Sequence, residues 1–164
     1  MTDSISSSFT YSVLNRLSDY YVRHGIAAKL AEPDEEAPYY SLLIGFDELG
    51  ARNDSLLLEL SFIPGLEEAE QEGVYLFQTF AVIRERTSAD RYGALLHACA
   101  SLNLLLPLGA FGVAEPGGAL YFKHNSMLRS EWLAGEQGLQ HLDRANGLVL
   151  HQLHQFIDQL VDET

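Results

Sequence analysis

The stretch LNLLLPLGAFGVAEPGGALYFKH, residues 102–124, decides how the chain is built, because its glycines fit either a ligand loop or a turn. A phosphate-binding loop uses backbone amides that open a helix, whereas these glycines lead into a strand-like run. The stretch has no GxGxxG pattern and no lysine placed as in GxxxxGKS/T. Pro116 can fix the start of a turn at EPGG, in which Gly117 or Gly118 takes a positive φ. We therefore interpret the stretch as the joint between a helix and a β-hairpin.

Three segments have the spacing of amphipathic helices. The first helix ends at Gly25. The second, just before the joint, begins at Ser88, which is a good N-cap. The last helix runs from about 138 to 161. Their apolar rows are Val13, Leu14, Leu17, Tyr20 and Tyr21, then Tyr92, Leu95, Leu96, Cys99 and Leu102, then Leu139, Leu142, Val149, Leu153, Phe156 and Leu160. Asn146 interrupts the last row: either it is buried and specifies one helix pairing, or Gly147 marks a bend there.

Residues 39–85 contain three strand-like runs, YYSLLIGFDELGARNDS, LLLELSFIP and GVYLFQTFAVIRE, with short connections. Adjacent strands joined by short turns pair most simply as an antiparallel meander. The predicted order is a helix, a three-stranded antiparallel meander, a helix, a β-hairpin and a C-terminal helix, which is an α+β fold. We expect one domain over residues 1–164, with residues 1–8 as a frayed, serine-rich start.

The composition argues against several classes of protein. Ten Lys and Arg residues against 23 Asp and Glu residues give a formal charge of −13, which repels nucleic-acid phosphates. No apolar run reaches the roughly 18 residues of a membrane span, and the N-terminus lacks signal-peptide features. We therefore expect a cytoplasmic protein that binds neither nucleic acid nor membrane. The acidic blocks at 31–36 and 65–72 are interpreted as solvated loops, with a basic docking partner as the alternative.

Candidate catalytic or metal-ligating groups are few. His151 and His154 lie three residues apart and Asp158 follows four residues later, so one helix can bring all three near a metal ion. Polar residues beside a leucine row are also typical of a solvated helix face, which we favour. Cys99 lies on an apolar row and is expected to be a buried hydrophobe. We expect no enzyme activity and no cofactor; the alternative is a small metal-dependent protein or enzyme that uses His151, His154 and Asp158.

Both faces of the predicted strands carry apolar side chains. One face must pack on the helices, and the other is wrapped by another helix or offered to a second polypeptide, because large exposed apolar patches are uncommon on monomers. Tyrosines suit such a surface, since the ring is buried while the hydroxyl stays in water. The side chains assigned to partner binding are Leu57, Ile63, Tyr75, Phe77 and Tyr121. The sequence thus favours a protein-binding module that is also a homodimer.

The order of elements and the region 92–128 resemble a known family. A helix with an asparagine near its end, Asn103, runs into a strand with Gly109 and Phe111, followed by a hairpin with Gly117 and the run 120–122. This is similar to the type III secretion chaperone-like fold, which secretion chaperones share with YbjN-like proteins. The resemblance implies a homodimer that binds an extended segment of a partner protein on apolar patches, without catalysis or cofactor.

Overall fold

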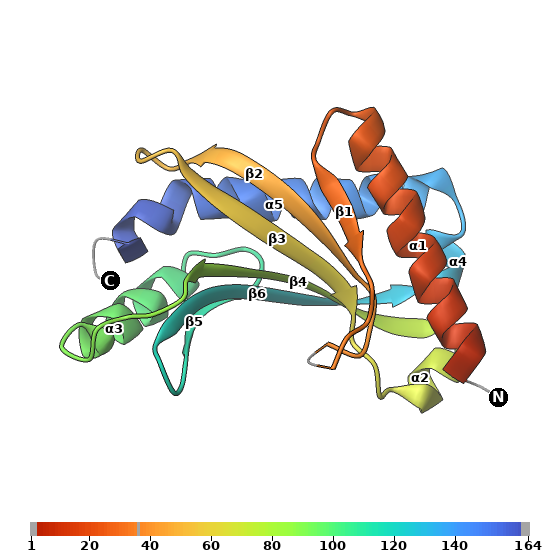
Figure 1. The fold of residues 1–164 in the computed structure, drawn as a ribbon, viewed down its shortest axis with the longest axis horizontal. Coiled ribbons are helices and arrows are strands. Elements are labelled where there is room, and N and C mark those ends of the chain that lie inside the picture. The colour runs from red at the N-terminus through yellow and green to blue at the C-terminus, as the bar shows by residue number, and fades with distance from the viewer. Residues whose placement is uncertain (1–2, 36, 162–164) are drawn as a thin grey trace.

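The computed structural model describes residues 3–35 and 37–161, which form an α+β fold (Figure 1). The helices within these residues are α1 (Asp3–Arg23), α2 (Glu67–Gln71), α3 (Tyr92–Asn103), α4 (Ser130–Leu133) and α5 (Glu136–Val161). The strands are β1 (Ala28–Ala31), β2 (Ser41–Leu49), β3 (Asp54–Phe62), β4 (Val74–Arg84), β5 (Ala110–Ala114) and β6 (Ala119–Arg129). Residues 1 and 2 of the expected frayed start lie outside the described residues, and Asp3 to Ser8 belong to α1.

The described strands form one antiparallel sheet in the order β1-β2-β3-β4-β6-β5. The meander of β2, β3 and β4 and the hairpin of β5 and β6 are both present, so the predicted α+β fold is confirmed. The hairpin joins the meander through β6, which leaves β5 at an edge. The other edge strand, β1, was not predicted, because its four residues are too few to show an alternating pattern.

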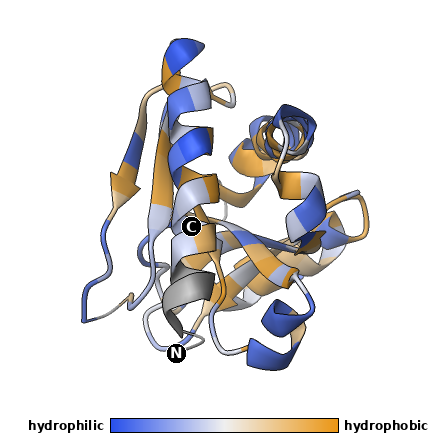
Figure 2. Cartoon of the chain, turned by 90° about the vertical axis from the view of Figure 1, so that its right-hand side faces the viewer, coloured by the Kyte–Doolittle hydropathy of each residue, from blue (hydrophilic) through white to orange (hydrophobic). Residues whose placement is uncertain are grey.

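The long helices lie on one side of the sheet, which we call the inner face, and the opposite side is the outer face. Helix α5 runs along the sheet behind β2 and β3 in Figure 1, α1 crosses one end of the sheet, and α3 lies beside β5 at the other end. Viewed along its axis in Figure 2, α5 carries both hydrophilic and hydrophobic residues around its circumference. An amphipathic helix of this kind buries one stripe against a sheet and leaves the rest in water.

The core fills the space between the inner face and these helices. Alternate residues of β3 face the helices, and Leu56, Leu58, Leu60 and Phe62 are all buried. Their neighbours come from the predicted apolar rows of the helices, in which the buried side chains are Val13, Leu14, Leu17 and Tyr21 of α1, Leu95, Cys99 and Leu102 of α3, and Leu139, Leu142, Val149, Leu153, Phe156 and Leu160 of α5. Burial raises the pKa of the Cys99 thiol, which fits a packed side chain rather than a nucleophile.

The joint between α3 and β5 is held by two side-chain amides. Asn103 accepts a hydrogen bond from the Phe111 N–H (2.7 Å) and donates one to the Phe111 carbonyl (2.9 Å). Gln152 of α5 makes the same pair of bonds to Leu108, at 3.0 Å to the N–H and 3.1 Å to the carbonyl. The two amides satisfy backbone groups that no helix or strand partner reaches. The interpretation of this stretch as a structural joint, drawn from its glycines and proline, is therefore confirmed.

Asn146 is buried at the centre of the molecule and joins three elements. Its side-chain oxygen accepts a hydrogen bond from the Thr79 hydroxyl of β4 (3.2 Å), and its amide donates one to the Tyr21 hydroxyl of α1 (3.0 Å). Burial raises the pKa of Tyr21, the largest effect on that phenol. Of the two interpretations of Asn146, the structure supports a buried amide that specifies how α1 and α5 pack.

Two local predictions were wrong. Ser88 does not cap the second helix: α3 begins at Tyr92 after Arg91, which makes no side-chain cap bond, and Ser88 instead lies in the preceding turn, where its carbonyl accepts the Arg91 N–H. The acidic block at 65–72 is not entirely a loop, because Glu67–Gln71 forms the short helix α2. Its glutamates lie in the first turn, where carboxylates favour the positive end of the helix dipole.

Candidate binding surface

The outer face of the sheet exposes apolar side chains from three strands. Leu57 of β3, Val82 of β4 and Met127 of β6 are 53%, 45% and 70% exposed. Leu76, Phe80 and Tyr121 lie on the same side and are half-buried, as the register shows: Leu76 is opposite Met127, and Val82 is opposite Tyr121. The Phe80 and Tyr121 rings stack with centroids 5.6 Å apart. We call Leu57, Leu76, Phe80, Val82, Tyr121 and Met127 the outer patch.

The structure places two of the predicted partner-binding residues in the outer patch and a third beside it. Leu57 and Tyr121 belong to the patch, and Ile63 is half-buried at the end of β3, on the same side as Leu57. The other four patch residues, Leu76, Phe80, Val82 and Met127, are not among the residues that the sequence assigns to partner binding. Their signal was present as alternation along β4 and β6, but alternation alone does not say which set faces outward.

Tyr75 and Phe77 were predicted on the open face and are instead in the core, 7% and 2% exposed. The reason is strand register. Phe77 lies directly opposite Phe62, and residues opposite each other in an antiparallel pair share a side of the sheet. Because Phe62 faces the helices, Phe77 does too, and Tyr75 follows two residues away. The Tyr75 ring packs on Phe9 of α1, with centroids 4.6 Å apart.

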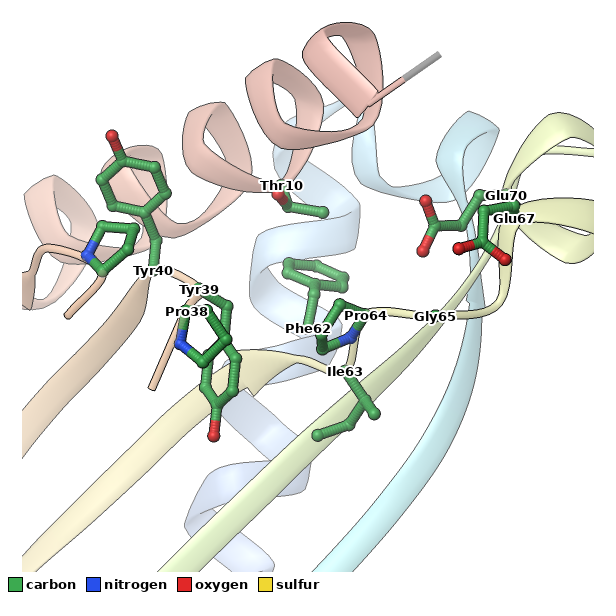
Figure 3. Close-up of a pocket in the computed structure, with 11 residues that line it drawn as sticks. Thr10, Pro38, Tyr39, Tyr40, Phe62, Ile63, Pro64, Gly65, Glu67 and Glu70 are labelled. Carbon is green, nitrogen blue, oxygen red and sulfur yellow. The ribbon is translucent and has the colours of Figure 1, made fainter. Parts of the chain in front are cut away.

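A pocket of about 400 Å³ lies where the end of β3 meets α1, Pro33 and residues 38–40 (Figure 3). Its apolar lining is aromatic and proline-rich, and consists of Pro33, Pro38, Tyr39, Tyr40, Phe62, Ile63 and Pro64. Pro38, Tyr39 and Tyr40 lie on one side of it, while Glu67 and Glu70 lie on the side of α2. We call it the edge pocket, since Ile63 connects it to the outer face.

The edge pocket is electrostatically negative. Its described lining includes Glu67 and Glu70 and no Lys, Arg or His. Burial raises the pKa of Tyr39, and the carboxylates of Glu59 and Asp34 raise it further. A phenol whose ionisation is opposed by neighbouring carboxylates marks a site that disfavours added negative charge. Such a pocket can accept a side chain that has an apolar stem and a positively charged end, and the aromatic rings can make cation–π contacts with that charge.

Two of the three residues considered as alternative metal ligands, His154 and Asp158, have a structural role. The Asp158 carboxylate accepts a hydrogen bond from the Ala51 N–H (2.7 Å), and the His154 Nδ1 accepts one from the Gly50 N–H (3.1 Å). Both backbone groups belong to the turn between β2 and β3, so α5 holds the tip of this hairpin. His151 is exposed on the helix. Among the described residues, no three His, Cys, Asp or Glu side chains are grouped so that they could hold a metal ion. A metal site made of His151, His154 and Asp158 is therefore not supported.

Replacing Asp158 with alanine is expected to lower the free energy of unfolding by about 1.5–3 kcal/mol, because a charged acceptor of a backbone N–H is removed. The amide protons of Gly50 and Ala51 should exchange with solvent faster in the same variant, which NMR can measure. His151→Ala is the matched control on the same helix and should change neither quantity. Equal destabilisation by His151→Ala, or unchanged exchange in the hairpin turn, would contradict the anchoring role.

Comparison with known proteins adds one finding about the fold. No protein-family model matches the chain, and no curated protein matches its sequence. A similar solved structure is the crystal structure of YbjN from E. coli. It aligns with 88% of this chain and 87% of its own, at 12% identity and a TM-score of 0.48. The match concerns the path of the chain and carries no argument about function. The resemblance of the sequence to secretion chaperones stays a prediction.

None of the described helices combines the length and the apolar character that crossing a membrane requires.

Proposed function

We propose that the protein is a non-enzymatic module that binds a segment of a partner polypeptide on the outer patch, with the edge pocket receiving a basic side chain of that segment. The observation that supports the proposal most is the open outer face. Leu57, Val82 and Met127 are about half exposed or more, because the three long helices cover only the opposite side of the sheet. Exposed apolar side chains gathered on one face are typical of surfaces that associate with other molecules.

Charge favours a basic partner segment over a second copy of this chain. Each copy carries a formal charge of −13, so two copies repel one another at long range, whereas a cationic segment is attracted. The edge pocket adds local complementarity through Glu67 and Glu70.

The predicted homodimer is tested by sedimentation: a dimer has twice the mass of 18.2 kDa, and a species of 18.2 kDa at micromolar concentration would contradict it.

Two synthetic peptides test the proposed function by fluorescence anisotropy. Both are extended and alternate leucine with a charged residue, which is lysine in one and glutamate in the other. The lysine peptide is expected to bind and the glutamate peptide not to bind. Met127→Ser should weaken binding of the lysine peptide about tenfold, since burial of one large apolar side chain is worth about 1.5–3 kcal/mol. Glu67→Gln together with Glu70→Gln should weaken binding and reduce its salt dependence.

Val22→Ser is the matched control for this experiment, because Val22 is 57% exposed on α1, outside the outer patch. It should leave peptide binding unchanged. Absence of any binding, or equal losses in Met127→Ser and Val22→Ser, would exclude the outer patch as the binding surface.

A further inference from the structure

A second pocket, on the inner side of the sheet, is not used by the proposed function. It lies between α5 and the strands β4 and β6, with Leu108 of the segment between α3 and β5 in its wall. Its volume is about 450 Å³, within the usual range of sites for small molecules. The two faces of the sheet are separated by the strands, so this pocket is distinct from the outer patch. We call it the inner pocket.

Most of the inner pocket is apolar. Its hydrocarbon walls come from the sheet, from the segment between α3 and β5, and from α5, and they consist of Phe77, Leu108, Leu128, Leu142, Ala145 and Leu148. Leu148 is 40% exposed, whereas Phe77 and Leu142 are 2% exposed. The exposed Leu148 indicates that the pocket opens at α5, and the buried Phe77 and Leu142 indicate an apolar interior. A ligand with a hydrocarbon body would be desolvated there.

Basic groups gather around the same pocket. His141 and Arg144 are three residues apart on α5, so they lie on neighbouring positions of one helix face, and both are exposed. His124 and Ser126 of β6 line the pocket from the inner face of the sheet. Burial lowers the pKa of His124, so this ring favours its neutral form, which donates one hydrogen bond.

The absence of carboxylates from this lining is informative. The described residues that line the inner pocket include no Asp and no Glu, although the chain has 23 of them. Arginine pairs with a carboxylate through two parallel hydrogen bonds, and such charge-assisted bonds are stronger than neutral ones. An anion at this opening therefore meets Arg144 and His141 in a protein that otherwise repels it.

The wall beside this opening has fixed polar groups. Thr79 and Asn146 also line the pocket, and they are bonded to each other and onward to Tyr21. Because their hydrogen bonds are already made inside the protein, they do not compete with Arg144 for a ligand. The charged end of a ligand is thus directed toward α5, and its apolar end toward Phe77 and Leu128.

From this arrangement we propose that the inner pocket binds a small amphipathic monocarboxylate, with the carboxylate at His141 and Arg144 and the hydrocarbon body between α5 and β6. The ligand chemistry follows from one arginine at an apolar pocket without acidic lining. The binding is independent of the proposed polypeptide partner, which uses the opposite face of the sheet.

Calorimetric titration with octanoate, 1-octanol and octylamine tests this proposal. Octanoate should bind saturably at one site per chain, at least tenfold more tightly than 1-octanol, and octylamine should not bind. Arg144→Gln should weaken octanoate about tenfold, and Leu148→Glu should abolish binding by placing a negative charge at the opening. Arg23→Gln on α1 is the control and should have no effect.

Three outcomes would overturn the proposal. Equal affinity for octanoate and 1-octanol would show that the basic groups do not select the ligand. An equal loss in Arg144→Gln and Arg23→Gln would indicate a general effect of net charge. Octanoate binding that is lost in Met127→Ser but kept in Leu148→Glu would place the ligand on the outer patch, and in that case the proposed peptide binding would still stand on its own test.

Discussion

Replacing Phe77 with alanine is expected to lower the free energy of unfolding by about 3–5 kcal/mol, because a buried aromatic ring is lost and a cavity remains. Phe77 is 2% exposed and its ring packs on Phe62 with centroids 5.2 Å apart. Urea denaturation measures the change. Binding of the lysine peptide at temperatures where the variant is still folded should be unaffected, since Phe77 faces the helices and not the outer face.

Leu57→Ala is the matched control on the neighbouring strand. Its side chain is 53% exposed, so the free energy of unfolding should change by less than about 1 kcal/mol, while peptide binding weakens. The two variants together test which side of the sheet packs on the helices. If Leu57→Ala were the more destabilising of the two, the register of β3 with β4 described here would be wrong.

Replacing Gly109 with alanine is expected to cost at least about 2 kcal/mol of folding stability. Gly109 has φ +69°, a left-handed conformation that side chains disfavour. An added Cβ would also lie 2.7 Å from the Lys123 carbonyl oxygen and 2.5 Å from the Phe122 ring. The carbonyl belongs to β6 and cannot move without breaking the sheet, so relaxation is limited. Thermal unfolding by circular dichroism measures the loss.

Gly147→Ala provides the opposite expectation. Gly147 lies in α5, has no positive φ, and an added Cβ would meet nothing within 4 Å. Alanine in a helix interior is favoured over glycine by about 0.5–1 kcal/mol, so this variant should be more stable than the parent chain. A similar loss in both glycine variants would mean that the special geometry of the joint at Gly109 is not what makes alanine costly there.

The local character of most elements was predictable because it depends on short-range periodicity. The apolar row of α1, the alternation in β3 and the EPGG turn were each visible within a few residues of sequence. The C-terminal stop of α1 was also visible: Gly25 has φ +77°, and the His24 ring lies 2.7 Å from the Tyr20 carbonyl in the last turn. Such signals act within one turn, so they can be recognised without knowledge of distant contacts.

Contacts between distant residues could not be predicted in this way. The roles of His154 and Asp158 depend on the tip of a hairpin more than 100 residues earlier, and nothing in their spacing separates an anchor from a metal ligand. The same holds for the inner pocket, whose residues come from β4, β6, α5 and the segment between α3 and β5. Only the folded chain brings these groups together.

The amino-acid order alone therefore establishes an acidic α+β chain in which both sides of the strands are apolar and a glycine-rich joint connects a helix to a hairpin. It does not establish which side of β4 is open, because either of the two alternating sets of residues can face the helices. Pairing of Phe77 with Phe62 selects one solution, burying Tyr75 and Phe77 and leaving Phe80 and Val82 outside. That selection depends on the register between strands, which is a property of the packed sheet and not of either strand.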